Sequence, residues 1–204
     1  EQAGSFTSSD PGLDQLWQES LNTLAICMRD TYMDCPERER GPYMGDASNE
    51  IDAALYSYDQ GGLDLTKKAI LACVAWTRAD GAIPSRAPSV KPQEIPNQSL
   101  IFMTSVYHYW LHSGDRETAE AYCNAFLNYL RLVEMKNGLP VYRDGSWKWD
   151  DWGDRIDTRL LQTGIYYYAL NVTKSLADDL GITEGTEFLD ERMNSMRENW
   201  RAVY

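Results

Sequence analysis

Two segments of helical periodicity are separated by residues 34–46, which read DCPERERGPYMGD. These thirteen residues hold four carboxylates, two arginines, two prolines and two glycines. Neither a helix nor a strand continues easily through prolines and glycines at this density, so the stretch predicts a polar loop of defined shape. Charged loops of this kind are often solvated connectors, but loops also carry much of a protein's function, and both interpretations stay open on composition alone.

The charges of this loop favour a chemical role. We expect the backbone to hold the carboxylates of Asp34, Glu39 and Asp46 in place. The neighbouring Arg38 and Arg40 would then keep one carboxylate ionised and leave another free to titrate. A difference of this kind separates a general acid from the other carboxylates of an active site.

Composition excludes several classes of partner. The chain has 204 residues, of which 43% are apolar, and this suits one domain or a part of one. A net charge of −12 argues against binding to nucleic acid, because such binding neutralises phosphates with Lys and Arg. No apolar run approaches the roughly 20 residues that span a bilayer, and no charged-then-apolar leader opens the chain. We therefore expect neither a nucleic-acid nor a membrane partner.

Motifs for cofactors and metals are also missing from the sequence. The four cysteines are far apart and form no CxxC spacing. His108 and His112 are four residues apart and could share a metal, but histidine is common in the last turn of a helix. Because no glycine-rich phosphate loop occurs either, we expect no cofactor and no metal.

Helical periodicity on both sides of the loop predicts an all-α protein of about seven helices. These are expected at about residues 11–31, 47–60, 63–80, 99–111, 116–135, 158–180 and 186–204, with Asp46 as a possible cap of the second. The connections alternate between long (32–46, 80–98, 136–157) and short (60–63, 113–116, 181–185). Alternate connections of antiparallel helical hairpins emerge at opposite ends, so the three long loops are expected to share one rim.

The third long loop is rich in aromatic residues. Trp147, Trp149 and Trp152 alternate with charged residues, which favours a partly exposed stacking platform over burial in the core. Asp151 and Asp154 lie in the same loop. They would either contact a substrate or cap and balance the start of the following helix.

Residues 34–40, with the pattern Asp-Cys-Pro-x-Arg-Glu-Arg, and the following Gly45-Asp46 resemble the signature of bacterial α-L-rhamnosidases, glycoside hydrolase family 78. Residues 80–84 and the WDDWGD segment at 149–154 resemble later rim loops of that family. Its catalytic domain is an (α/α)6 toroid, in agreement with the hairpin arrangement expected from the loop lengths. The resemblance implies that residues 1–204 form the N-terminal half of such a toroid.

The resemblance also implies inverting hydrolysis of terminal α-L-rhamnosyl residues. Glu39 matches the general acid, and Asp34 and Asp46 match carboxylates that hold sugar hydroxyls and tune that acid. The family's catalytic base is a glutamate of a later rim loop, expected beyond residue 204. The implied partners are therefore a carbohydrate substrate and the remainder of the same catalytic domain, and the family favours a periplasmic or secreted location.

Departures from the family pattern affect the expected sugar site. Pro42-Tyr43-Met44 replaces the usual Gly-Trp, so Tyr43 is expected to form the aromatic wall. The expected substrate-binding residues are Arg38, Tyr43, Trp149, Asp151, Trp152 and Asp154. Two alternatives stay open: a six-hairpin glycosidase with another sugar specificity, and a noncatalytic carbohydrate-binding helical domain.

Overall fold

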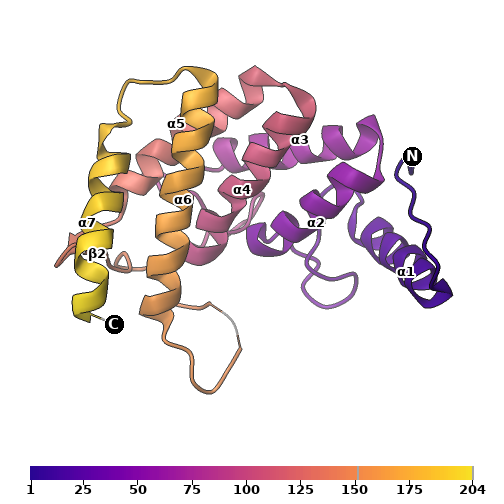
Figure 1. Ribbon diagram of the computed structural model, residues 1–204, viewed down its shortest axis with the longest axis horizontal. Helices are drawn as coiled ribbons and strands as arrows, with labels where there is room; N and C mark the ends of the chain where they lie inside the picture. Colours follow the sequence, from indigo (N-terminus) through magenta and orange to yellow (C-terminus); the bar gives the residue numbers. More distant parts are fainter. Residues whose placement is uncertain (151, 204) are drawn as a thin grey trace.

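The computed structural model describes residues 1–150 and 152–203, and the described residues form seven helices and one two-stranded sheet (Figure 1). The helices are α1 Pro11–Cys27, α2 Met44–Ser57, α3 Gln60–Ala75, α4 Pro96–Ser113, α5 Arg116–Leu132, α6 Thr158–Leu180 and α7 Glu187–Val203. The strands are β1 Met135–Lys136 and β2 Leu139–Pro140, which pair antiparallel. The predicted all-α class is confirmed. None of the helices in the described ranges is long and apolar enough to cross a bilayer.

The helix ends agree best with the prediction where local capping signals are strong. Helix α6 begins after Asp157, whose side chain accepts hydrogen bonds from two backbone N–H groups of the first turn, and it ends at Gly181 with φ of 69°. The α4–α5 turn follows the same rules, because Gly114 has φ of 65° and Asp115 caps α5. Both bounds of α6 are therefore as predicted.

Several helix boundaries differ from the prediction. Helix α3 ends at Ala75 instead of near residue 80, α4 begins at Pro96 instead of near residue 99, and α5 ends at Leu132 instead of near residue 135. Helix α1 ends at Cys27, and α2 begins at Met44, so Asp46 lies in the first turn of α2 and does not cap it. The predicted stop at residues 61–62 is wrong, because Asp59 caps α3 and accepts a hydrogen bond from the Gly61 N–H. These glycines therefore lie in the first turn of α3.

The β-hairpin after α5 was not predicted. Helix α5 ends at Leu132, and the strands that follow are joined by Asn137 and Gly138, which have φ of 52° and 78°. Asn-Gly is a strong hairpin signal, since both positions of a type I′ turn need positive φ. The strands contain only two residues each, which is too short for an alternating pattern to be recognised.

The core lies around α4, which packs against both α2 and α6. Large side chains of α4 and α5 fill the centre, and Phe102, Tyr122, Phe126 and Tyr129 are almost completely buried. Burying one side chain of this size contributes roughly 1.5–3 kcal/mol. The packed helices form a rigid layer, and the loops that begin and end on them are held in fixed relative positions.

The long connections gather at one side of this layer. In Figure 1 the loop before α2 and the loop before α6 both extend from the lower edge, whereas the α6–α7 turn lies at the upper edge. The connections are residues 28–43, 76–95 and 133–157, against short turns at 58–59, 114–115 and 181–186. The expected alternation of long and short connections is therefore confirmed.

Candidate active site

Residues from all three long connections and the adjoining helix ends line one cavity of about 290 Å³, which we call the rim pocket. Its lining residues are Asp34, Arg38, Glu39, Tyr43, Asp46, Ile95, Gln98, Trp147, Trp149 and Trp152. The acids that begin at residue 34 and the indoles near residue 150 therefore meet in one place, as the loop lengths predicted.

A larger cavity of about 840 Å³ lies between the β-hairpin and the start of α6. Its charged lining is mostly cationic, with Lys136, Lys148, Arg155 and Arg159 against Asp157. General acid–base chemistry requires positioned groups that can give or take a proton near neutral pH. This cavity is the larger of the two, but the rim pocket has the carboxylates and aromatic rings that a sugar site needs, so we take the rim pocket as the candidate active site.

The backbone of the first loop holds Asp34 firmly. The Gly41 N–H donates to Asp34 Oδ1 at 2.8 Å, and the Asp34 N–H donates to the Gly41 carbonyl oxygen at 3.0 Å. Between them, Arg40 has φ of 49°, in the left-handed region, which turns the chain back on itself. The Asp34 carboxylate is thus fixed by a closed loop.

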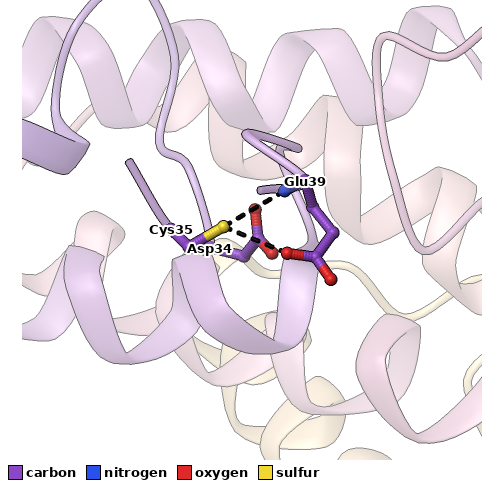
Figure 2. A group of neighbouring side chains, drawn as sticks. All are labelled: Asp34, Cys35 and Glu39. Carbon is purple, nitrogen blue, oxygen red and sulfur yellow. Dashed lines mark hydrogen bonds between the residues drawn. The ribbon is translucent and has the colours of Figure 1, made fainter. Parts of the chain in front are cut away.

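Glu39 is held by two neighbours, Arg38 and Cys35. The Cys35 thiol donates to Glu39 Oε2 at 3.1 Å, and the Glu39 N–H donates to Cys35 Sγ at 3.3 Å, as Figure 2 shows. The hydrogen bond from the Arg38 guanidinium, and then that from Cys35, lowers the pKa of Glu39 to about 2. Glu39 is therefore ionised in this structure, and the side chain of Arg38 is 83% exposed.

Asp34, Cys35 and Glu39 also resemble a metal-binding group, because one potential ligand atom from each lies within 4.8 Å of the others (Figure 2). However, Asp34 Oδ1, Cys35 Sγ and Glu39 Oε2 each have a hydrogen-bond partner within the loop. These hydrogen bonds explain the cluster without an ion.

Aromatic side chains form the other walls of the rim pocket. The ring centroids of Trp147 and Trp149 are 5.8 Å apart, and those of Trp149 and Trp152 are 5.9 Å apart at 70°. Trp152 is 81% exposed, so the indoles form a surface that is open to solvent. Tyr43 lies under Arg86, whose guanidinium carbon is 5.0 Å from the centre of the Tyr43 ring.

The sequence matches the family described as the bacterial α-L-rhamnosidase six-hairpin glycosidase domain over residues 1–204. The chain belongs to this family. The resemblance noted in the motif around Glu39 is thereby confirmed, together with the six-hairpin fold class. The comparison with curated protein sequences found no match.

Solved structures agree with the family assignment. A family 78 rhamnosidase of Bacillus sp. GL1 is 25% identical with a TM-score of 0.87, over all of this chain and 22% of that chain. A rhamnosidase from Klebsiella oxytoca with rhamnose bound is 21% identical with a TM-score of 0.83, over 97% of this chain and 39% of that chain. The chain therefore spans about a fifth to two fifths of the length of these rhamnosidases.

In this rhamnosidase-family domain, Glu50 is a partly buried carboxyl close to Asp34 and Asp46 that the sequence did not indicate. It lies on α2 one turn after Asp46, and its Oε2 atom is buried without a hydrogen-bond partner. Burial, followed by the negative charges of Asp46 and Asp34, raises the pKa of Glu50 to about 8, against a hydrogen bond from Cys27 that lowers it. The carboxyl that Arg38 keeps ionised is thus Glu39, and the carboxyl that keeps its proton at neutral pH is Glu50.

Two residues that line the rim pocket, Ile95 and Gln98, were also missed, whereas Glu50 is not among its lining residues. Gln98 packs closely over Gly45, where an added Cβ atom would lie 2.9 Å from Gln98 Cγ. Both residues stand where the second long loop enters α4. Their position at the end of a long loop could have indicated a place in the pocket. Neither residue is charged, so the search for acids and aromatic residues did not find them.

One expected binding residue, Asp154, does not join the residues that line the rim pocket. Its side chain is exposed. Asp151 lies outside the described residues. The cap of α6 is Asp157.

Proposed function

We propose that this chain is the N-terminal half of the catalytic domain of a glycoside hydrolase that removes terminal α-L-rhamnosyl residues with inversion. The observation that carries the proposal is the meeting of three acids and three indoles in the rim pocket. Carboxylates bind sugar hydroxyls and move protons, and indole faces stack on sugar rings. In this proposal the sugar lies between the acid loop and the indoles.

Glu39 is the proposed general acid, and its ionised state sets a condition on the mechanism. To protonate the leaving oxygen, Glu39 must first gain a proton, which requires that Arg38 move away from it. Ion pairs as exposed as this one contribute little to stability and exchange readily. We infer that Arg38 turns to the sugar hydroxyls when substrate binds, and that the pKa of Glu39 then rises.

The proposed reaction breaks the bond between the anomeric carbon and the leaving oxygen. The proton of Glu39 passes to that oxygen, while a water molecule attacks the opposite face and gives its proton to a base. In an inverting enzyme the two carboxyl groups are about 6.5–9.5 Å apart, with the water between them. The acids of the rim pocket all come from the loop and the first turn of α2 within residues 34–46. The base is therefore proposed to lie in the remainder of the domain.

Replacing Glu39→Gln in the full-length protein tests the acid role. For an aryl α-L-rhamnoside with a poor leaving group we expect kcat to fall at least about a hundredfold, because general acid catalysis supplies that much. A substrate with a good leaving group needs less protonation and should lose much less. Glu37→Gln is the matched control, since Glu37 is in the same loop, is exposed and does not line the rim pocket. Unchanged hydrolysis of both substrates would remove Glu39 from this role.

A second candidate is a noncatalytic carbohydrate-binding domain. The observation that favours it is the ion pair between Arg38 and Glu39, because a carboxylate that Arg38 holds ionised donates no proton. A full-length protein that binds L-rhamnose in calorimetry but cleaves no aryl glycoside would support this candidate. Cleavage of another aryl glycoside in preference to the rhamnoside would instead indicate a six-hairpin glycosidase of different specificity.

A further inference from the structure

The second long connection, residues 76–95, holds the two walls of the rim pocket together. On one side its Ser85 carbonyl oxygen accepts a hydrogen bond from the Met44 N–H at 2.9 Å, where the acid loop enters α2. On the other side its Glu94 carbonyl oxygen accepts from the Trp147 N–H at 2.8 Å, where the indoles begin. We call residues 76–95 the bridging loop.

The bridging loop contains a carboxylate that is almost completely buried. The Glu94 side chain is only 2% exposed, and both of its oxygens are engaged. The Tyr129 hydroxyl donates to Oε1 at 2.9 Å, and Arg143 Nε donates to Oε2 at 3.2 Å. A buried charge persists only when it is paired in this way.

Arg143 connects both ends of the bridging loop to the indole segment. Besides Glu94, it contacts Asp80, with Nη2 at 2.8 Å from Asp80 Oδ2. Its own side chain is 16% exposed, while that of Asp80 is 43% exposed. Arg143 therefore contacts two carboxylates that are fourteen residues apart in the chain, and it lies four residues before Trp147.

A contribution to the stability of the fold does not by itself explain why Arg143 contacts both Glu94 and Asp80. Replacing a buried ion pair by apolar residues of similar volume is often neutral or stabilising, whereas its directed hydrogen bonds favour one geometry over others. The planar guanidinium group has donors in fixed directions, so it holds the segment before Trp147 in one position relative to Glu94 and Asp80.

We propose that Arg143 is a positioning residue of the rim pocket, which fixes the indole wall against the acid loop by joining Glu94 and Asp80. Arg143 is not among the residues that line the rim pocket, and it acts through Trp147 and the indoles that follow. This inference rests on the proposed function for its effect on catalysis. Its effect on the position of the indole wall is independent of the substrate.

The test uses Arg143→Lys and Asp80→Asn in the full-length protein. Lysine keeps the charge but lacks the two-directional donors, and Asp80→Asn removes one carboxylate while it leaves Glu94 paired. We expect KM for an aryl α-L-rhamnoside to rise about tenfold in Arg143→Lys and less in Asp80→Asn, with kcat within about twofold of the wild type. Loosened indoles weaken binding, while the acid loop keeps its own hydrogen bonds.

Arg78→Lys is the matched control. Arg78 also pairs with Asp80, at 3.2 Å, but its contacts are within the bridging loop. A KM increase of the same size in Arg78→Lys would overturn the proposal, because the effect would then come from the bridging loop in general. A fall in kcat equal to the rise in KM would also overturn it.

Hydrogen exchange without substrate separates this inference from the proposed function. We expect faster amide exchange in residues 144–150 of Arg143→Lys, with unchanged exchange in residues 34–46 and in Arg78→Lys. Wild-type exchange in residues 144–150 would overturn the positioning role. If the wild-type protein neither binds nor cleaves rhamnosides, the proposed function fails, and the exchange pattern still decides whether Arg143 holds the indole wall.

Discussion

Glu50 shows how burial changes the chemistry of a single residue. It is an ordinary acidic residue in the sequence, but in the fold one of its oxygens is covered and unpaired, and the pKa rises to about 8. A carboxyl with a strongly shifted pKa beside other acids is typical of functional sites. Its charge state also affects the stability of the protein.

The pKa of Glu50 predicts a specific pH dependence of stability. Between about pH 4.5 and about pH 8 the folded state keeps the proton that the unfolded chain releases, so this residue makes the protein less stable as the pH rises. Below this range both states hold the proton, and the dependence vanishes. Glu50→Gln removes this pH dependence, because glutamine does not titrate. The stability of the variant relative to the wild type should therefore increase as the pH rises from 4.5 to 8.

Denaturant midpoints of the full-length protein at pH 4.5 and pH 8 would measure this gain. Glu37→Gln is the control, because Glu37 is exposed. A difference between Glu50→Gln and the wild type that is the same at both pH values would contradict the assignment of a raised pKa.

At the scale of elements, helices α6 and α2 differ in whether a nearby residue caps the start of the helix. Helix α6 has Asp157 before it and Gly181 after it, and its bounds were predicted correctly. Helix α2 has no side-chain cap, because Tyr43 stands at its N-cap and Ser85 of the bridging loop accepts the Met44 N–H. A partner so far away in the sequence leaves no local signal, so the start of α2 was placed too late.

The hairpin between α5 and α6 allows a test at the same scale. Gly138 has φ of 78°, and an added Cβ atom would meet the side chain of Asn199 on α7. Gly145 has φ of 81°, but nothing lies within 4 Å of its Cβ position. Each alanine substitution is expected to lower the free energy of unfolding by about 1–2 kcal/mol, because alanine is disfavoured in the left-handed region. Only Gly138→Ala also creates a steric conflict.

We therefore expect Gly138→Ala to lower the free energy of unfolding by more than Gly145→Ala, by about 1 kcal/mol or more. Denaturant unfolding of the full-length variants would measure the difference. Equal losses in the two variants would show that Asn199 moves aside without cost.

At the scale of the whole molecule, the rim pocket depends on loops that begin on different helices. Its three acids lie within residues 34–46, and inversion requires a carboxylate on the opposite face of the sugar. The chain spans only 22% of the Bacillus rhamnosidase it resembles. Residues 1–204 alone are therefore expected to give no measurable turnover of an aryl rhamnoside.

The full-length protein assayed under identical conditions is the reference for this prediction. Circular dichroism would establish that residues 1–204 are folded when tested. Robust hydrolysis by the folded fragment would mean that the described acids suffice, and the proposed division of the catalytic domain would be wrong.

The sequence by itself determined the helices, the alternation of long and short connections, and the motif around Glu39. These features depend on periodicity, loop length and local residue types, all of which act within a few neighbours along the chain. They were enough to place the acids and the indoles on one rim.

Only the tertiary structure decided which carboxyl keeps its proton, what caps α2 and how the indole wall is held. Burial sets the pKa of Glu50, and contacts between distant residues join Ser85 to Met44 and Arg143 to Glu94. Desolvation and long-range hydrogen bonds exist only after the chain has packed, so no local pattern encodes them.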